Sequence, residues 1–127
     1  MLAVDTNIVV RYLTTDDPVQ AKRARNLVDS NPVFLPSTVV LESEWVLRSY
    51  RLTRPQVLAQ LRHFLSLPTV TVENPLRVAK ALAWAEAGMD FADALHLAAA
   101  ENCAAFITFD RPLVKAARLH GLTIRSP

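Results

Sequence analysis

The chain of 127 residues contains one cysteine, two glycines and three histidines. Because Cys103 is single, it cannot form a disulfide within the chain, and with three scattered histidines it provides no zinc-type ligand set. The two glycines, Gly88 and Gly121, are too few for a phosphate-binding glycine loop or a dinucleotide fingerprint. If the protein handles phosphates, it has to hold them by other means. The cysteine usage favours a reducing, cytoplasmic setting.

Long apolar runs are also missing. The apolar share is 51%, but no run approaches the roughly 20 residues that a membrane span requires. We therefore expect no contact with a membrane. The length gives room for one domain, residues 1–127, with one core, so an active site has to be assembled from several segments of that domain.

Five short apolar stretches have the length and β-branched content of buried strands. They are residues 2–4, 33–35, 70–72, 104–107 and 122–124. Six longer segments between them have helical character: residues 17–30, 37–50, 54–65, 75–87, 91–102 and 111–120. Strands that alternate with helices predict parallel pairing. We therefore expect a three-layer α/β/α domain, Rossmann-like, with helices on both faces of one parallel five-stranded sheet.

Two of the predicted helices begin with a capping residue close to a proline. Asp17 directly precedes Pro18, and Thr53 stands two residues before Pro55. Aspartate or threonine at the N-cap with proline in the first turn is typical of a helix start. These pairs predict where both helices begin.

Two aspartates follow predicted strands. Asp5 comes directly after the strand at 2–4, and Asp110 comes shortly after the strand at 104–107. The carboxyl ends of parallel strands share one edge of the sheet, and ligands of open α/β sheets bind at that edge. An aspartate between a strand and a helix is also a good N-cap. Both roles, cap and site residue, therefore remain open for each of them.

Asp90 and Asp93 are three residues apart at a predicted helix start, so they face the same side. A cap at Asp90 and compensation of the helix dipole by Asp93 would explain both. Asp93, however, precedes the apolar run at 94–100, which only His96 interrupts. We expect its carboxylate near the buried sheet edge, where an unpaired charge is costly unless a cation compensates it.

Glu42 and Glu44 flank the apolar arc of the predicted helix at 37–50 on opposite sides. The helical phase does not choose between them. Whichever is not a site residue is expected to be a solvated flank charge.

Carboxylates that converge from several segments would repel one another, and their proton affinities would rise. A cation among them removes this repulsion. Oxygen ligands without cysteine or histidine favour a hard cation such as Mg²⁺ or Mn²⁺. One or two such ions can activate water and neutralise the charge that develops on a phosphodiester.

The charge balance agrees with an anionic substrate. The net charge is +2, but when Asp5, Glu42, Asp93 and Asp110 are set aside, 14 basic residues remain against 8 acidic ones, a net charge of +6. An acidic pocket in a basic surround suits a polyanion. Only Arg111, next to Asp110, has a positional reason to touch the substrate.

Four short motifs follow one another along the chain. They are Val4-Asp5-Thr6-Asn7, residues 40–47 around Glu42, Asp93-Ala94-Leu95-His96, and Thr108-Phe109-Asp110. In this order and spacing, and over essentially the whole chain, they resemble the PIN domain, and within it the VapC-like toxins of bacterial toxin-antitoxin pairs.

The resemblance implies a twisted parallel five-stranded sheet flanked by helices, and cleavage of RNA that depends on Mg²⁺ or Mn²⁺. It implies that the catalytic and metal-binding residues are Asp5, Glu42, Asp93 and Asp110, which selects Glu42 over its acidic neighbour. We expect Asp90, one turn before Asp93, to be an additional metal ligand.

The resemblance also implies supporting residues and partners. Asn7 resembles a polar residue that orients Asp5, and Thr6 and Thr108 resemble hydroxyls that support the metal ligands. The family implies a homodimer and a cognate antitoxin that covers the active-site groove.

Two other functions remain open from the sequence. One is a metal-dependent nuclease or phosphoesterase that acts on structured DNA or a small phosphoester. The other is a non-catalytic binding module whose acidic patch docks a basic segment of a partner. Saturable binding of Mn²⁺ at near-neutral pH would favour the enzyme hypotheses over docking.

Overall fold

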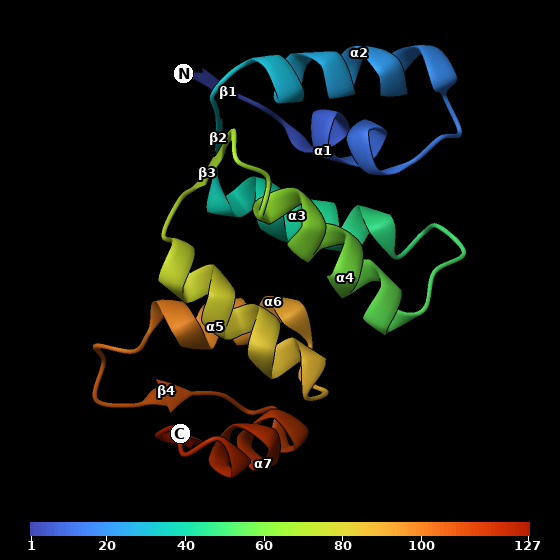
Figure 1. The fold of residues 1–127 in the computed structure, drawn as a ribbon. Helices are drawn as coiled ribbons and strands as arrows, with labels where there is room; N and C mark the ends of the chain where they lie inside the picture. The colour runs from blue at the N-terminus through green and yellow to red at the C-terminus, as the bar shows by residue number, and fades with distance from the viewer. The chain divides into compact units, whose positions relative to one another are not determined.

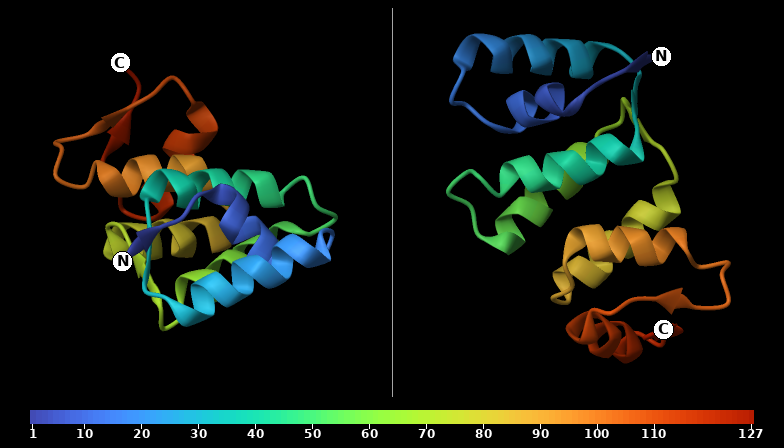
Figure 2. Two further views of the ribbon diagram at one scale, coloured as in Figure 1. Left: turned by 90° about the horizontal axis from the view of Figure 1, so that it is seen from above. Right: turned by 180° about the vertical axis from the view of Figure 1, so that it is seen from behind.

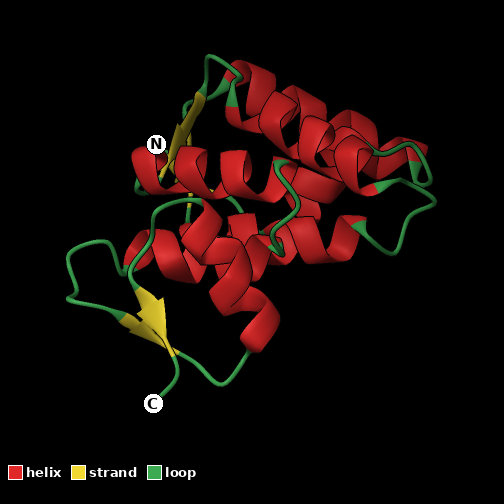
Figure 3. Ribbon diagram, turned by 90° about the horizontal axis from the view of Figure 1, so that it is seen from below, coloured by secondary structure: helices red, strands yellow, loops and turns green.

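A computed structural model describes residues 1–127 as seven helices and five short strands that alternate along the chain (Figure 1). Helices make up most of the structure, and the strands are brief (Figure 3). The chain divides into two compact units, Met1–Pro75 and Leu76–Pro127. None of the helices has both the length and the apolar character that crossing a membrane would require.

Unit 1 (Met1–Pro75) has a parallel sheet in the strand order β1-β2-β3. In the register, Leu2 lies opposite Val33, and Phe34 lies opposite Thr71. The carboxyl ends of the strands therefore meet at one edge. Its elements in chain order are β1 (Leu2–Ala3), α1 (Thr6–Leu13), α2 (Pro18–Ser30), β2 (Val33–Leu35), α3 (Ser37–Leu47), α4 (Arg54–Leu65) and β3 (Val70–Val72).

The core of unit 1 forms where α1 packs against α2, α3 and α4, and where α4 packs against β3. Figures 1 and 2 show α1 and α2 side by side. The fully buried side chains are aliphatic or aromatic, which removes their surface from water and stabilises the packing. They include Val9, Val28, Val33, Leu35, Val40, Leu47, Leu61 and Phe64.

Unit 2 (Leu76–Pro127) begins inside a helix and ends with a two-stranded parallel sheet, in which Phe106 lies opposite Ile124. Its last helix packs against the final strand. Buried side chains come from every helix of the unit, among them Leu82, Phe91 and Leu113. The elements are α5 (Pro75–Glu86), α6 (Phe91–Ala99), β4 (Phe106–Ile107), α7 (Arg111–Leu119) and β5 (Ile124–Arg125).

The α/β class and the parallel pairing are confirmed, but the single five-stranded sheet is wrong. The structure has one sheet of three strands and a second of two. Alternation of strands and helices predicts parallel direction, but it does not determine how many strands share one ladder. Segments of two or three residues form few interstrand hydrogen bonds, and here each strand pairs only with strands of its own unit.

Helix α1 was not predicted from the sequence. Three consecutive β-branched residues, Ile8, Val9 and Val10, lower its helix propensity and favour extended structure. The helix forms because Asp5 caps it and because Val9 and Val10 are buried against neighbouring helices. Tertiary packing therefore overrides the local preference.

The predicted helix starts at Asp17 and Thr53 are confirmed. The Asp17 carboxylate accepts a hydrogen bond from the backbone N–H of Gln20, and Thr53 forms a reciprocal capping box with Gln56. Two predicted helices end three residues too late. The helix predicted at 37–50 ends at Leu47 (α3), and the helix predicted at 91–102 ends at Ala99 (α6).

Candidate active site

Asp5 stands at the carboxyl end of β1 and is the N-cap of α1. Its Oδ1 accepts a hydrogen bond from the backbone N–H of Ile8 at 3.2 Å. The side chain is exposed, so the cap leaves Oδ2 available to a ligand. Capping and a role in a site are therefore compatible for this residue.

Glu42 is fixed by a side chain from another helix. The hydroxyl of Thr6, at the start of α1, donates a hydrogen bond to Oε1 of Glu42 on α3. Thr6 is buried, whereas Glu42 is exposed. A buried donor with few rotamers restricts where the exposed carboxylate can point. Unit 1 thus holds Glu42 in a defined orientation.

Glu44 corrects one expectation. A solvated flank charge was predicted for the glutamate that is not a site residue, but Glu44 is only 2% exposed. Its Oε1 accepts a hydrogen bond from Nε of Arg48, one turn later, at 2.7 Å. The ion pair supplies the counter-charge that a buried carboxylate requires. Helical phase could not show this, because it does not reveal which flank other helices cover.

Glu73 is a structural residue that the sequence did not reveal. Pro36 stands at the N-cap of α3 and makes no side-chain capping bond. Instead, Oε1 of Glu73, directly after β3, accepts hydrogen bonds from the backbone N–H of Ser37 at 2.9 Å and from its hydroxyl at 2.7 Å. These bonds hold the pKa of Glu73 below its usual range. Glu73 thereby fixes the start of the helix that carries Glu42.

Asp90 and Asp110 are also N-caps. Asp90 begins α6 and accepts a hydrogen bond from the N–H of Asp93 at 3.2 Å. Asp110 begins α7 and accepts one from the N–H of Leu113 at 3.0 Å. The hydroxyl oxygen of Thr108 accepts a hydrogen bond from the N–H of Asp110, also at 3.0 Å. Thr108 therefore supports the backbone at Asp110.

Asp93 lies in the first turn of α6, partly buried, between negative neighbours. Desolvation raises its pKa, and the charges of Asp90 and Asp110 raise it further, against a smaller opposite effect of His96. Burial and like charges both make the ionised carboxylate costly. Unit 2 thus brings Asp90 and Asp110 within electrostatic reach of Asp93, and a cation would relieve the repulsion on Asp93.

The remaining predicted residues lie on the surface. Asn7 and Asp5 line the same groove between α1 and α2, with a volume of about 710 Å³. Arg111, the first residue of α7, is exposed. Taken alone, neither unit has a group of three or more acidic, histidine or cysteine side chains that would hold a metal ion.

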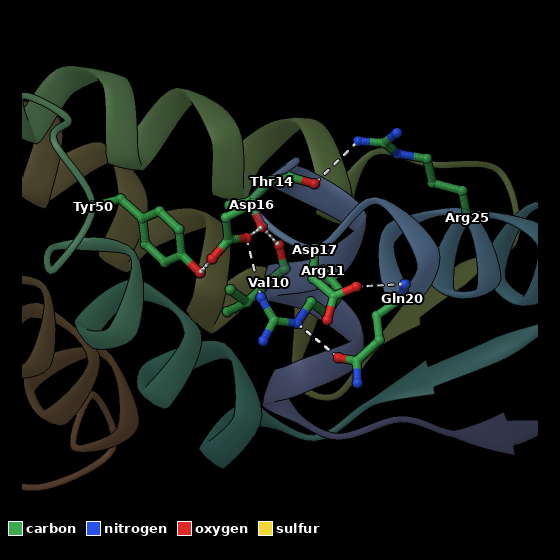
Figure 4. A network of polar contacts seen from close by, with 8 residues as sticks. All are labelled: Val10, Arg11, Thr14, Asp16, Asp17, Gln20, Arg25 and Tyr50. Atoms are coloured by element: carbon green, nitrogen blue, oxygen red, sulfur yellow. Dashed lines mark hydrogen bonds and ion pairs between the residues drawn. The ribbon is translucent and has the colours of Figure 1, made fainter.

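Figure 4 shows a polar network around α1 and α2, of which Arg11 and Gln20 also line the groove beside Asp5. Arg11 of α1 donates a hydrogen bond from Nε to Oε1 of Gln20 on α2 at 2.9 Å and forms an ion pair with Asp16 at 3.0 Å. Arg25 donates to the backbone carbonyl oxygens of Tyr12 and Thr14. These contacts hold α1 and α2 together, so both arginines stabilise the packing of the two helices.

Comparison with known proteins identifies the family. The PIN domain family matches residues 2–119, which is nearly the whole chain and extends through both units. A search of curated proteins gives no significant match. The chain belongs to the PIN domain family. PIN domains are typically metal-dependent nucleases, and they generally use divalent ions such as Mg²⁺ or Mn²⁺.

The side chains fit this class of protein. The acidic groups at the starts of α1, α6 and α7 and on α3 provide only oxygen ligands, which suit hard divalent cations. Burial, and then the charges of Asp90 and Asp110, raise the pKa of Asp93, and a cation beside these carboxylates would favour its ionised form.

Proposed function

We propose that this protein is an endoribonuclease that requires Mg²⁺ or Mn²⁺ and acts as the toxin of a toxin-antitoxin pair. The observation that carries the proposal is the position of Asp93 in the first turn of α6, where burial and then the charges of Asp90 and Asp110 raise its pKa, in a chain of a nuclease family. The choice of RNA and the toxin role rest on the resemblance of the four sequence motifs to VapC-like toxins.

We further propose roles for the acidic residues. Asp5, Asp93 and Asp110 are metal ligands, Asp90 is an additional ligand, and Glu42 holds a metal or orients the attacking water. A divalent ion bound by these oxygens would activate water and neutralise charge on the phosphodiester.

The local structure explains what the chain itself contributes. Thr6 restricts the Glu42 carboxylate, and Thr108 supports the backbone that carries Asp110. The caps at Asp5 and Asp110 hold each carboxylate at the start of a helix. Carboxylates fixed in this way need little reorganisation when they act, which favours catalysis.

The partners belong to the same proposal. A cognate antitoxin that covers the active-site groove, a homodimer and a cytoplasmic location follow from the resemblance to VapC-like toxins. A toxin without its antitoxin should arrest growth when it is expressed alone, and Asp5→Asn should relieve the arrest.

A substrate comparison tests the proposal. Purified protein is incubated with one sequence as single-stranded RNA and as DNA, and with a small phosphodiester, in Mg²⁺, in Mn²⁺ and in EDTA. We expect metal-dependent cleavage of the RNA that leaves a 5′-phosphate and a 3′-hydroxyl. Preferred cleavage of DNA or of the small ester, or undiminished cleavage in EDTA, would overturn it.

A further inference from the structure

One face of α7 carries three basic side chains in a row. Arg111, Lys115 and Arg118 stand at positions i, i+4 and i+7, so they lie on the same side of the helix. They line a surface groove with a volume of about 530 Å³. The rest of its lining is Val114, Leu119 and Ser126, with no acidic side chain.

These three cations have no anionic partner in the structure. Neither Arg111, Lys115 nor Arg118 takes part in an ion pair. The 17 residues after Asp110 contain four basic and no acidic residues, so this end of the chain is uniformly positive. Like charges at i and i+4 disfavour a helix. An anionic ligand would compensate this repulsion.

The basic face begins beside a proposed site residue. Asp110 is the N-cap of α7, and Arg111 is the first helical residue. At 1.5 Å per residue, Arg118 lies about 10 Å further along the helix axis. The cations therefore form a line that leads away from Asp110.

We propose that this basic face of α7 binds consecutive phosphates of the nucleic-acid strand on one side of the cleaved bond. The proposal rests on the proposed nuclease function and adds Lys115 and Arg118 as residues that position the substrate. The exposed Leu119, beside Arg118 in the groove, offers an apolar surface to riboses or bases. A nucleic acid is favoured over an acidic protein because PIN nucleases act on nucleic acid.

The salt dependence of binding tests the proposal. For single strands, each phosphate contact contributes about 0.7 to the slope of log K against log salt concentration. Lys115→Gln/Arg118→Gln should therefore lower the slope by about 1.4. Lys22→Gln/Arg51→Gln is the matched control, because it removes the same two residue types from exposed positions outside this groove.

Binding is measured by fluorescence anisotropy of a labelled single-stranded RNA in EDTA, at salt concentrations from about 50 to 200 mM. The expected result is a reduced slope for the α7 variant and an unchanged slope for the control. An equal reduction in both variants, or in neither, overturns the proposal. The proposal is also overturned if the α7 variant keeps the wild-type salt dependence of RNA binding but loses binding to an oligoglutamate peptide. The basic face would then bind an acidic protein segment.

This test separates the two proposals. Binding in EDTA does not require cleavage, so the slope can change even if the protein proves not to cleave RNA. Where cleavage is observed, the α7 variant should raise KM several-fold and leave kcat near the wild-type value, because phosphate contacts away from the cleaved bond contribute binding. A loss confined to kcat would contradict a role in positioning the substrate.

Discussion

The hydroxyl of Thr6 on α1 donates a hydrogen bond to the carboxylate of Glu42 on α3. The two residues are 36 positions apart, and the bond joins the helix after β1 to the helix after β2. It makes the orientation of Glu42 depend on the packing of α1, which also places Asp5.

Replacing Thr6 tests this dependence. Thr6→Val keeps the shape but removes the hydroxyl, and loss of such a supporting hydrogen bond typically lowers activity 10- to 100-fold. The free energy of unfolding should fall by only about 1 kcal/mol. Cleavage rates and urea unfolding measure the two effects. Thr6→Ser, which keeps the donor, should retain most of the activity, and equal losses in both variants would contradict the assigned role.

Asp5 combines a cap and a proposed metal ligand, and two substitutions separate these roles. Asparagine is as good an N-cap as aspartate, whereas alanine costs about 1 kcal/mol of stability. Asp5→Asn should therefore abolish cleavage and keep the wild-type stability. Asp5→Ala should abolish cleavage and also lower the stability. Thermal unfolding and cleavage assays on both variants provide the measurement. Wild-type cleavage by Asp5→Asn would remove Asp5 from the site.

The ion pair between buried Glu44 and exposed Arg48 predicts a stability effect without a direct role in catalysis. Arg48→Leu leaves the carboxylate of Glu44 buried without this counter-charge, which should cost about 2 kcal/mol. The double variant Glu44→Leu/Arg48→Leu should be less destabilised than the single one, because no charge remains buried. Urea unfolding tests this order, and a single variant as stable as wild type would show that the pair contributes nothing.

The contact of Glu73 with Ser37 predicts a pH dependence of stability. The pKa of Glu73 in the folded protein lies below 4.5, its value without these contacts. Its ionised form therefore stabilises the fold above that pH, and this contribution is lost as the pH falls through the folded pKa. Glu73→Gln should lower the Tm at pH 7 and make a smaller difference at about pH 3. An equal difference at both pH values would contradict the contact.

Local signals in the sequence were sufficient for most of the fold. Capping residues beside prolines located the starts of α2 and α4, and short apolar runs with β-branched residues located β2 and β3. The sequence could not show which strands share a sheet, because strands of two or three residues are too short for their pattern to indicate a pairing partner. Helix α1 was missed because burial of Val9 and Val10, and not propensity, makes it a helix.

The candidate site shows the same division. Asp5 and Asp110 could be identified because an acidic residue between a strand and a helix leaves a local pattern. Asp90 could be identified because it precedes a predicted helix start, with Asp93 three residues later. The burial of Glu44 and the capping of α3 by Glu73 could not be identified from the sequence, because both depend on segments that meet only in the folded chain.

Titration of the protein with Mn²⁺ in a calorimeter shows whether the carboxylates bind a divalent cation. We expect saturable binding at neutral pH that is lost, or weakened at least tenfold, both in Asp5→Asn and in Asp93→Asn, one substitution in each unit. Wild-type affinity in either variant would show that its carboxylate is not a ligand, and no saturable binding in the wild-type protein would contradict the metal-dependent mechanism.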